Sequence, residues 1–312
     1  MKIVVTGALG HIGSSLIRTL PTSFPDAELV LIDNMVTQRF ASLFDLPSIG
    51  RYRFHEADVR SADLRPLFED AHAVVHLAAT TDAAGSAGNA AAVEANNYNA
   101  TAKVSEACIE TGARLIHLSS TSVYGTQDTT VSEDCAADDL KPQSPYAETK
   151  LKEENLVRSL VEKRGLKAIV CRFGTIFGPS PGMRFHTAVN KFCWQAVMRQ
   201  PLSVWRTAYD QKRPYLDLRD AVRAFAFIIE HNLFDGRIYN VLTLNATVRD
   251  IAETIREFVP DLEISFVDSP IMNQLSYEVS PQRFLDKGFV FSGDIRTGIG
   301  GTMSLLRAAH QR

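Results

Sequence analysis

Short strand-like runs alternate with longer stretches of helical periodicity over residues 1–173. The runs predict buried parallel strands at 2–6, 28–32, 53–57, 73–77, 114–118 and 167–173. Helical periodicity is clearest at 12–20, 92–111 and 145–163. Strand and helix thus alternate six times, which predicts an α/β fold built on a doubly wound parallel sheet.

The pattern is less regular after residue 179. Helices are expected at 184–199, 217–231, 247–259 and 297–310, with short strands at 202–205, 237–241 and 263–267. These elements predict a smaller C-terminal lobe that packs on the sheet domain. We expect the sheet domain to comprise 1–173 and 214–245, and the lobe to comprise 174–213 and 246–312.

A glycine-rich turn joins the first predicted strand to the first helix. Gly7 allows a tight turn, Gly10 lets the backbone approach a pyrophosphate, and Gly13 lets helix and strand pack closely. Asp33-Asn34 ends the second strand, where an acid accepts hydrogen bonds from an adenosine ribose and repels a 2′-phosphate. The combination predicts a Rossmann domain that binds NAD in preference to NADP.

Small and polar residues follow the later strands. Asp58-Val59 could hold an adenine edge, or Asp58 could cap the next helix. The small residues at 78–81 would let a cofactor lie close, and the hydroxyls at 119–122 stand where open α/β sheets bind ligands. Asn97, on the helix at 92–111, is expected either to meet the cofactor or to face solvent.

Tyr146 and Lys150 lie four residues apart on a predicted helix that begins Ser144-Pro145. Serine is a good N-cap and proline suits the first helical position, so the pair should share one face. A nearby ammonium and a cationic nicotinamide would stabilise the phenolate, whose pKa is ordinarily about 10. The pair is therefore a candidate catalytic base, against the alternative of an aromatic anchor beside a solvated lysine.

Composition limits the remaining classes of function. The chain has 312 residues, 45% apolar content and a net charge of -3, which gives no reason to expect nucleic acid or a membrane as partner. The four cysteines show no metal-ligand spacing, so we expect no metal and a reducing compartment. A strand beginning at residue 2 leaves no room for a signal peptide, and a cytoplasmic location is expected.

The motifs above are followed by three more, at 172–179, 213–220 and 239–241. In this order, over about residues 1–260, the set resembles the extended short-chain dehydrogenase/reductase family. Within that family it is most similar to the NAD-dependent nucleotide-sugar epimerase/dehydratase branch, and in particular to UDP-glucose 4-epimerases.

The resemblance implies a role for individual residues. Tyr146 matches the catalytic base, Lys150 the lysine that holds the ribose and lowers the tyrosine pKa, and Ser120 the hydroxyl that bonds the reacting sugar oxygen. NAD is expected at Gly7, Gly10, His11, Ile12, Gly13, Asp33, Asn34, Asp58, Val59, Leu77, Ala78, Ala79 and Asn97, besides Tyr146 and Lys150. The nucleotide-diphosphate sugar is expected at Thr80, Ser120, Thr121, Ser122, Arg184, Asn190, Trp205 and Arg213.

Several departures from the family pattern bear on the reaction. Thr121 and Ser122 replace the Asp-Glu pair of 4,6-dehydratases, which disfavours dehydration, and Ser122 also replaces a glutamate of some sugar-acid decarboxylases. Gly174 replaces a substrate-binding asparagine. Residues 271–275 stand where relatives offer an Arg-x-Gly-Asp segment, so one nucleotide contact is either missing or supplied by Arg184.

The hypothesis is a nucleotide-sugar 4-epimerase that acts by transient oxidation at C4. The alternatives are a nucleotide-sugar 4-dehydrogenase or ketoreductase of the same family, and a non-catalytic NAD-binding sensor. The resemblance also implies a homodimer formed through the helices at 92–111 and 145–163. The nucleotide and the sugar stay open.

Overall fold

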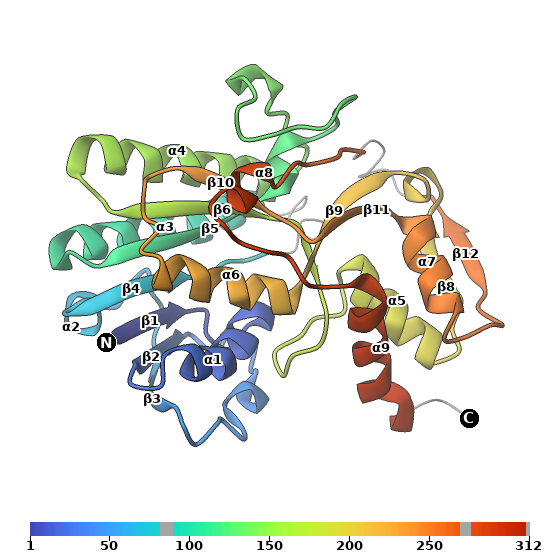
Figure 1. Ribbon diagram of the computed structural model, residues 1–312, viewed down its shortest axis with the longest axis horizontal. Coiled ribbons are helices and arrows are strands. Elements are labelled where there is room, and N and C mark those ends of the chain that lie inside the picture. Colours follow the sequence, from blue (N-terminus) through green and yellow to red (C-terminus); the bar gives the residue numbers. More distant parts are fainter. Residues whose placement is uncertain (82–89, 269–275, 310–312) are drawn as a thin grey trace.

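A seven-stranded parallel sheet forms the centre of the computed structural model, which describes residues 1–81, 90–268 and 276–309 (Figure 1). Its strand order is β10-β6-β5-β4-β1-β2-β3, which confirms the predicted doubly wound α/β fold. The order reverses between β1 and β4, where a crevice opens at the carboxyl ends of the strands. The strands are β1 (Lys2–Thr6), β2 (Glu28–Asp33), β3 (Arg51–Glu56), β4 (Ala71–His76), β5 (Arg114–Ser120), β6 (Ala168–Phe173) and β10 (Ile238–Val241).

Helices cover both faces of this sheet. Successive residues of β1 point to opposite faces, so Ile3 and Val5 join one hydrophobic core and Val4 joins the other. Helices α1 and α6 contribute to the first core, and α2, α3 and α4 contribute to the second. The helices are α1 (His11–Ser23), α2 (Arg65–Phe68), α3 (Ala90–Thr111), α4 (Pro145–Arg164) and α6 (Leu218–Glu230).

A further core lies among the elements drawn on the right of Figure 1. It is formed by helices α5, α7 and α9 together with strands of two small sheets, ordered β11-β9-β7 and β12-β8. The sequence pattern missed β7, β9 and β11, because they are short and β9 contains Pro214. The elements are α5 (Ala188–Val197), α7 (Val248–Arg256), α9 (Ile295–Leu306), β7 (Thr175–Phe177), β8 (Leu202–Trp205), β9 (Lys212–Asp217), β11 (Leu244–Thr247) and β12 (Ile264–Val267).

The segment before α9 lies against the large sheet, although the sequence pattern assigned all of 246–312 to the lobe. Phe284 and Phe289 are buried in the same core as α1 and α6, and α8 (Gln282–Leu285) contacts β10. The aromatic residues of this segment have no regular spacing, so their direction of burial could not be read from the sequence. The two-part division of the chain remains a proposal, and it is better drawn with 276–292 on the sheet side.

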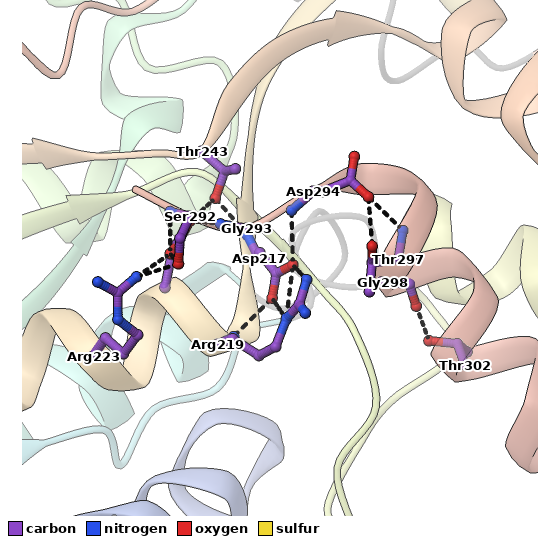
Figure 2. Close-up of polar contacts among 11 residues, drawn as sticks. Asp217, Arg219, Arg223, Thr243, Ser292, Gly293, Asp294, Thr297, Gly298 and Thr302 are labelled. Carbon is purple, nitrogen blue, oxygen red and sulfur yellow. Dashed lines mark hydrogen bonds and ion pairs between the residues drawn. The ribbon is translucent and has the colours of Figure 1, made fainter. Parts of the chain in front are cut away.

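Two buried carboxylates fasten the end of this segment to α6 (Figure 2). Asp217 caps α6 by accepting the Arg219 N–H at 2.8 Å. Asp220 accepts the backbone N–H groups of Ser292 and Gly293, each at 2.9 Å, and the Thr243 hydroxyl at 2.8 Å. The lobe helix α9 therefore starts from a point that is anchored to the sheet domain.

Two further findings apply to the described part of the chain. None of its helices combines the length and the apolar character that a membrane crossing requires. None of its His, Cys, Asp and Glu side chains gather in threes or more as a metal ion would need.

Candidate active site

The glycine loop between β1 and α1 is shaped by close backbone approaches. Gly7 has φ +66°, and a Cβ on it would lie 2.6 Å from the backbone nitrogen of Ala78. A Cβ on Gly13 would lie 2.5 Å from the carbonyl oxygen of Gly7. Helix α1 starts after Gly10 without a side-chain cap, so its first N–H groups stay available to an anion.

At the end of β2, Asp33 is held by two backbone donors. Its Oδ2 accepts the Leu9 N–H and its Oδ1 accepts the Met35 N–H, both at 3.0 Å. This arrangement fixes the carboxylate on the wall of the crevice, with lone pairs left over for a ribose diol.

Asp58, after β3, pairs with Arg60 and does not cap α2. Its carboxylate accepts the Arg60 backbone N–H at 2.9 Å and lies 2.5 Å from the Arg60 guanidinium. The hydrogen bonds and charge of Arg60 lower the pKa of Asp58 to about 2. The helix-cap alternative is therefore wrong, since α2 begins only at Arg65 with Leu64 as its N-cap.

Helix α4 presents Tyr146 and Lys150 as the sequence predicts. Ser144 caps the helix by accepting the Ala147 N–H at 3.2 Å, and Pro145 is its first residue. The Lys150 Nζ lies 5.9 Å from the centre of the Tyr146 ring. Lys150 is only 4% exposed, and its ammonium donates to the Leu118 carbonyl at 3.0 Å.

The hydroxyls after β5 form a short chain that leads to Tyr146. Ser120 Oγ accepts from the Ser122 N–H at 3.2 Å and from the Ser122 hydroxyl at 2.9 Å. Ser120 also acts on the Tyr146 phenol and lowers its pKa. Because Ser120 already accepts from Ser122, its own proton is directed toward Tyr146 or a ligand oxygen. Thr121 instead donates to the Phe173 carbonyl at 3.3 Å.

The pKa of Tyr146 is raised in this structure, although Lys150 acts on it in the predicted, lowering direction. Burial raises the pKa of the phenol, the Lys150 ammonium lowers it, and the Glu153 carboxylate raises it again. One cation with a carboxylate behind it does not outweigh burial. A base at neutral pH therefore needs the additional positive charge that a nicotinamide ring would bring.

A cavity of about 400 Å³ brings most of the predicted site residues together. They come from the ends of β1, β2, β3, β4 and β5, from the start of α4 and from the lobe. The predicted residues on its wall are Gly7, Gly10, His11, Ile12, Gly13, Asp33, Asn34, Asp58, Val59, Leu77, Ala78, Ala79, Thr80, Ser120, Thr121, Ser122, Tyr146, Arg184 and Arg213. A second hollow of similar volume, between α5, α7 and α9, contains none of the predicted residues.

Four predicted residues do not line this cavity: Asn97, Lys150, Asn190 and Trp205. Lys150 lies behind the wall, against Leu118. Asn190 is fully buried and donates to the Arg184 carbonyl at 3.1 Å, while Trp205 ends β8 in the two-stranded sheet. Asn97 is buried in α3, so it faces neither the cavity nor solvent. Residues 271–275, which were expected to stand in place of the Arg-x-Gly-Asp segment of relatives, lie outside the described residues.

Several residues on the cavity wall were not predicted from the sequence, among them Arg39, His186 and Tyr277. Arg39 donates to the Gly182 carbonyl at 2.9 Å, and Tyr277 OH lies 3.5 Å from Thr121 Oγ1. Tyr277 stands in an irregular segment that carries no motif, so no local signal marked it. Arg39 could have been noticed as a basic residue shortly after the ribose acid Asp33.

His11 connects the glycine loop to the start of the lobe. Its Nε2 lies 2.8 Å from the Gly178 carbonyl oxygen. Burial lowers the pKa of His11 to about 4, with Arg184 and Arg39 adding to the effect. The ring is therefore neutral at pH 7, and its Nε2–H donates to Gly178. The Ser180 hydroxyl donates back to the His11 carbonyl at 2.8 Å.

The cavity suits a dinucleotide. A Cβ on Gly10 would have only Gly7 O, at 3.3 Å, and Arg39 Nη1, at 4.0 Å, within reach, so glycine keeps the wall open beside the start of α1. Asp33 stands at one end of this opening, and Tyr146 with Ser120 stands at the other. The donor set fits a ribose, a pyrophosphate and a reacting ring in that order.

Comparisons with known proteins agree with this geometry. The chain is 30% identical over 313 residues to a trifunctional UDP-glucose 4,6-dehydratase/UDP-4-keto-6-deoxy-D-glucose 3,5-epimerase/UDP-4-keto-L-rhamnose-reductase of Arabidopsis thaliana. That match covers 97% of this chain but 46% of the relative, so the chain spans about half of its length. An uncharacterized UDP-glucose epimerase of Bacillus subtilis is 30% identical over 250 residues, which are 77% of this chain and 76% of the relative.

A solved structure and a family model complete the comparison. The UDP-glucuronic acid 4-epimerase of Bacillus cereus, in complex with UDP-glucuronic acid and NAD, superposes with a TM-score of 0.87 at 25% identity. The superposition covers 99% of this chain and 100% of that structure. The model of the NAD dependent epimerase/dehydratase family matches residues 3–241. The chain therefore belongs to the NAD dependent epimerase/dehydratase family, among the extended short-chain dehydrogenases/reductases, and its cofactor is NAD.

Proposed function

We propose that the protein is a nucleotide-sugar 4-epimerase. The observation that carries the proposal is the convergence of Tyr146 and Ser120 on one cavity with the glycine loop, with Lys150 directly behind the tyrosine. A sugar hydroxyl placed between Ser120 and Tyr146 would have both a hydrogen-bond donor and a base within reach.

The chain's own residues account for the proton transfers at C4. Ser120 bonds the C4 oxygen, Tyr146 in its phenolate form removes the hydroxyl proton, and Lys150 stabilises the phenolate charge. Bound NAD supplies a hydride acceptor and, once reduced, a hydride donor. After the 4-keto sugar has rotated and has taken the hydride back on its other face, return of the proton from Tyr146 to the C4 oxygen would complete an inversion at C4.

The cavity wall favours epimerisation over dehydration. Asp33 and Asp58 are the only carboxylates among the described residues that line the cavity, and both follow strands at the adenosine end. Beside Tyr146 the wall offers the hydroxyls of Thr121 and Ser122. Elimination of water from a 4-keto sugar needs a side chain that can protonate the leaving oxygen, and a hydroxyl is a poor acid for that step.

Two arginines support a diphosphate as part of the substrate. Arg184 and Arg213 come from the lobe segments and lie on the same wall, and Arg184 also donates to the Thr81 hydroxyl. Guanidinium groups bind phosphate oxygens through paired hydrogen bonds. A nucleotide-diphosphate sugar would therefore place its sugar toward Tyr146 and its phosphates toward these cations.

The test is a panel of UDP-glucose, UDP-glucuronic acid, UDP-N-acetylglucosamine and dTDP-glucose, with products identified by NMR. A C4 epimer of one substrate, formed without net change in NAD, is the expected result. Reduced cofactor accumulating in step with a 4-keto product would indicate a dehydrogenase instead, and NAD binding without turnover of any sugar would indicate a sensor.

Tyr146→Phe tests the assignment of the base, and Tyr124→Phe is its matched control. Loss of the base should lower turnover by roughly 10²–10⁴-fold while NAD still binds. Tyr124→Phe removes a hydroxyl that is fully buried against Asn240, away from the cavity, and should leave turnover nearly unchanged. Turnover of the Tyr146 variant at the wild-type rate would refute the assignment of the base.

We also propose a homodimer through α3 and α4, and a cytoplasmic location. The exposed side of α3 carries small side chains, Ala91, Ala92 and Ala95, which would allow a second helix pair to approach closely. Free thiols at all four cysteines are compatible with a reducing compartment. Sedimentation at micromolar concentration should show a dimer for the wild type and a monomer for an Ala95→Arg variant. A variant that sediments as the same dimer would contradict this interface.

A further inference from the structure

Two buried glutamates follow each other on α4, and only one of them has an arginine partner. Glu154 accepts from Arg172 at 2.7 and 2.9 Å and from the Ser119 hydroxyl at 2.6 Å. Glu153 is fully buried, and its Oε2 lies 2.9 Å from the Lys150 Nζ. The Glu154 pair fastens α4 to β6, whereas Glu153 contacts the lysine of the active site.

We propose that Glu153 is a positioning residue that keeps Lys150 charged and fixed behind Tyr146. The proposal rests on the proposed roles of Tyr146 and Lys150, but on no particular sugar. Glu153 would thus influence proton transfer at Tyr146 through Lys150, without contacting the tyrosine or the sugar.

Lys150 needs such a counterion because of where it lies. Its ammonium is almost completely buried, and its other acceptor, the Leu118 carbonyl, is uncharged. Removing an ammonium from water favours its neutral form unless an opposite charge is in contact with it. Burial indeed works to lower the pKa of Lys150, but Glu153 and then Tyr146 raise it, and together they prevail.

The carboxylate is also held from α3, where Thr101 donates to the same Oε2 at 3.0 Å. His117, on β5, places Nε2 3.4 Å from this oxygen without a hydrogen bond, and Oε1 accepts none among the described residues. Thr101 Oγ1 also lies 3.4 Å from His76 Nε2, on β4. The rotamer of Glu153 is thus fixed by its surroundings and not only by Lys150.

The neighbouring titratable groups do not replace Glu153. Burial lowers the pKa of His76 to about 3 and that of His117 well below its ordinary value, with Lys150 adding to both effects, so both rings are neutral. Arg172, on β6, is engaged by Glu154, and Arg184 acts on Tyr146 from the cavity side. Glu153 is therefore the anion in contact with Lys150 among the described residues.

The test is the titration of Tyr146 in the NAD-bound protein, followed by NMR of tyrosine labelled with ¹³C at Cζ and assigned with Tyr146→Phe. Loss of the Glu153 carboxylate by itself lowers the Tyr146 pKa, because that anion raises it. In Glu153→Gln the lysine should also lose its proton, and this larger effect should raise the Tyr146 pKa by about one unit, a tenfold change. Glu153→Asp, which keeps the charge, should restore at least half of the shift. The measurement needs no sugar, so it stands even if the proposed reaction is wrong.

Two results would overturn the proposal. An unchanged Tyr146 titration in Glu153→Gln would show a purely structural glutamate, and a downward shift would show that Lys150 keeps its charge unaided. Glu154→Gln is the matched control, because it neutralises the adjacent buried glutamate and should shift the Tyr146 pKa by less than half as much.

A folding defect in Glu153→Gln leaves the proposal testable through the double variant Lys150→Met with Glu153→Gln. Removing both charges should give a folded protein. Lys150→Met alone should not, because it leaves the buried Glu153 carboxylate without its cation. A folded Lys150→Met with an unfolded double variant would mean that Glu153 serves something other than Lys150, and would overturn the proposal.

Discussion

Asn97 and Thr80 are joined by two hydrogen bonds of 2.8 Å. The Thr80 N–H donates to Asn97 Oδ1, and Asn97 Nδ2 donates to the Thr80 carbonyl. Asn97 is 1% exposed within α3, whereas Thr80 lies on the cavity wall after β4. The asparagine therefore shapes the wall beside the cofactor site without touching the cavity.

Asn97→Ala should destabilise the protein and weaken NAD binding. Leaving the Thr80 backbone groups without partners should cost about 1–3 kcal/mol in the free energy of unfolding. Denaturant unfolding and NAD titration calorimetry measure the two effects. Asn155→Ala is the matched control, because Asn155 is exposed on α4 and lies outside the cavity, where it accepts from Arg158 at 2.7 Å. Equal losses in the two variants would count against a special role for Asn97.

Asp33→Ser should move cofactor preference from NAD toward NADP. The carboxylate repels a 2′-phosphate, and Arg39, which feels the charge of Asp33, lines the same cavity. Removing a like charge at this range should change the ratio of the two dissociation constants by about 10- to 100-fold. Calorimetry with each cofactor gives the ratio, and Asn34→Ser serves as the uncharged control. A constant ratio in Asp33→Ser would remove Asp33 from the ribose site.

His11 should make the protein less stable as the pH falls from 6.5 toward 4. Its pKa is about 4 in the folded state, against an ordinary 6.5, so over this range the unfolded state binds the extra proton. The free energy of unfolding should fall by about 1.4 kcal/mol per pH unit, or roughly 3 kcal/mol in all.

Urea unfolding at pH 7.5, 6 and 5 measures this slope. His11→Gln should reduce the slope of unfolding free energy against pH by the equivalent of about one proton. Part of the slope should remain, because burial lowers the pKa of His76 to about 3 as well. Identical slopes for the variant and the wild type would mean that His11 is already charged in the folded protein.

Asp220→Asn should loosen the attachment of residues 292–294. Asp220 is fully buried, and its two oxygens accept from two backbone N–H groups, a hydroxyl and the Arg223 guanidinium. An amide has only one acceptor oxygen, so we expect a loss of roughly 2–4 kcal/mol. Faster hydrogen exchange at Ser292 and Gly293 would report the site directly. Asp294→Asn, at the exposed cap of α9, should cost little, because asparagine caps a helix about as well as aspartate does.

The sequence predicted the large sheet because its strands are buried on both faces and end in recognisable turns. It also predicted that residues with a characteristic local spacing, such as Gly7, Gly13, Asp33 and the Tyr146–Lys150 pair, would lie at one site. These signals are contained within one strand–turn–helix unit, and tertiary packing did not alter them.

Residues whose role depends on distant partners were harder to find. Glu153 looks like one more charged residue in a polar helix, and only the fold shows that it is buried against Lys150. Asn97 carries a polar side chain that could equally meet solvent, a ligand or backbone. Strand β7 has only three residues and β9 contains Pro214, so neither shows a clear strand pattern. They form by pairing with segments that are distant in the sequence, β7 with β9 and β9 with β11.

The hydrogen bond from His11 to the Gly178 carbonyl joins the glycine loop to the segment that enters the lobe. A Cβ on Gly182 would lie 2.3 Å from the Leu9 carbonyl oxygen, so the segment at 178–182 packs directly on the glycine loop. A ligand that orders this segment through the lobe would therefore strengthen NAD binding, and NAD would strengthen binding of that ligand by the same factor. Binding at the NAD site and binding at the lobe segment should therefore be coupled by one and the same free energy.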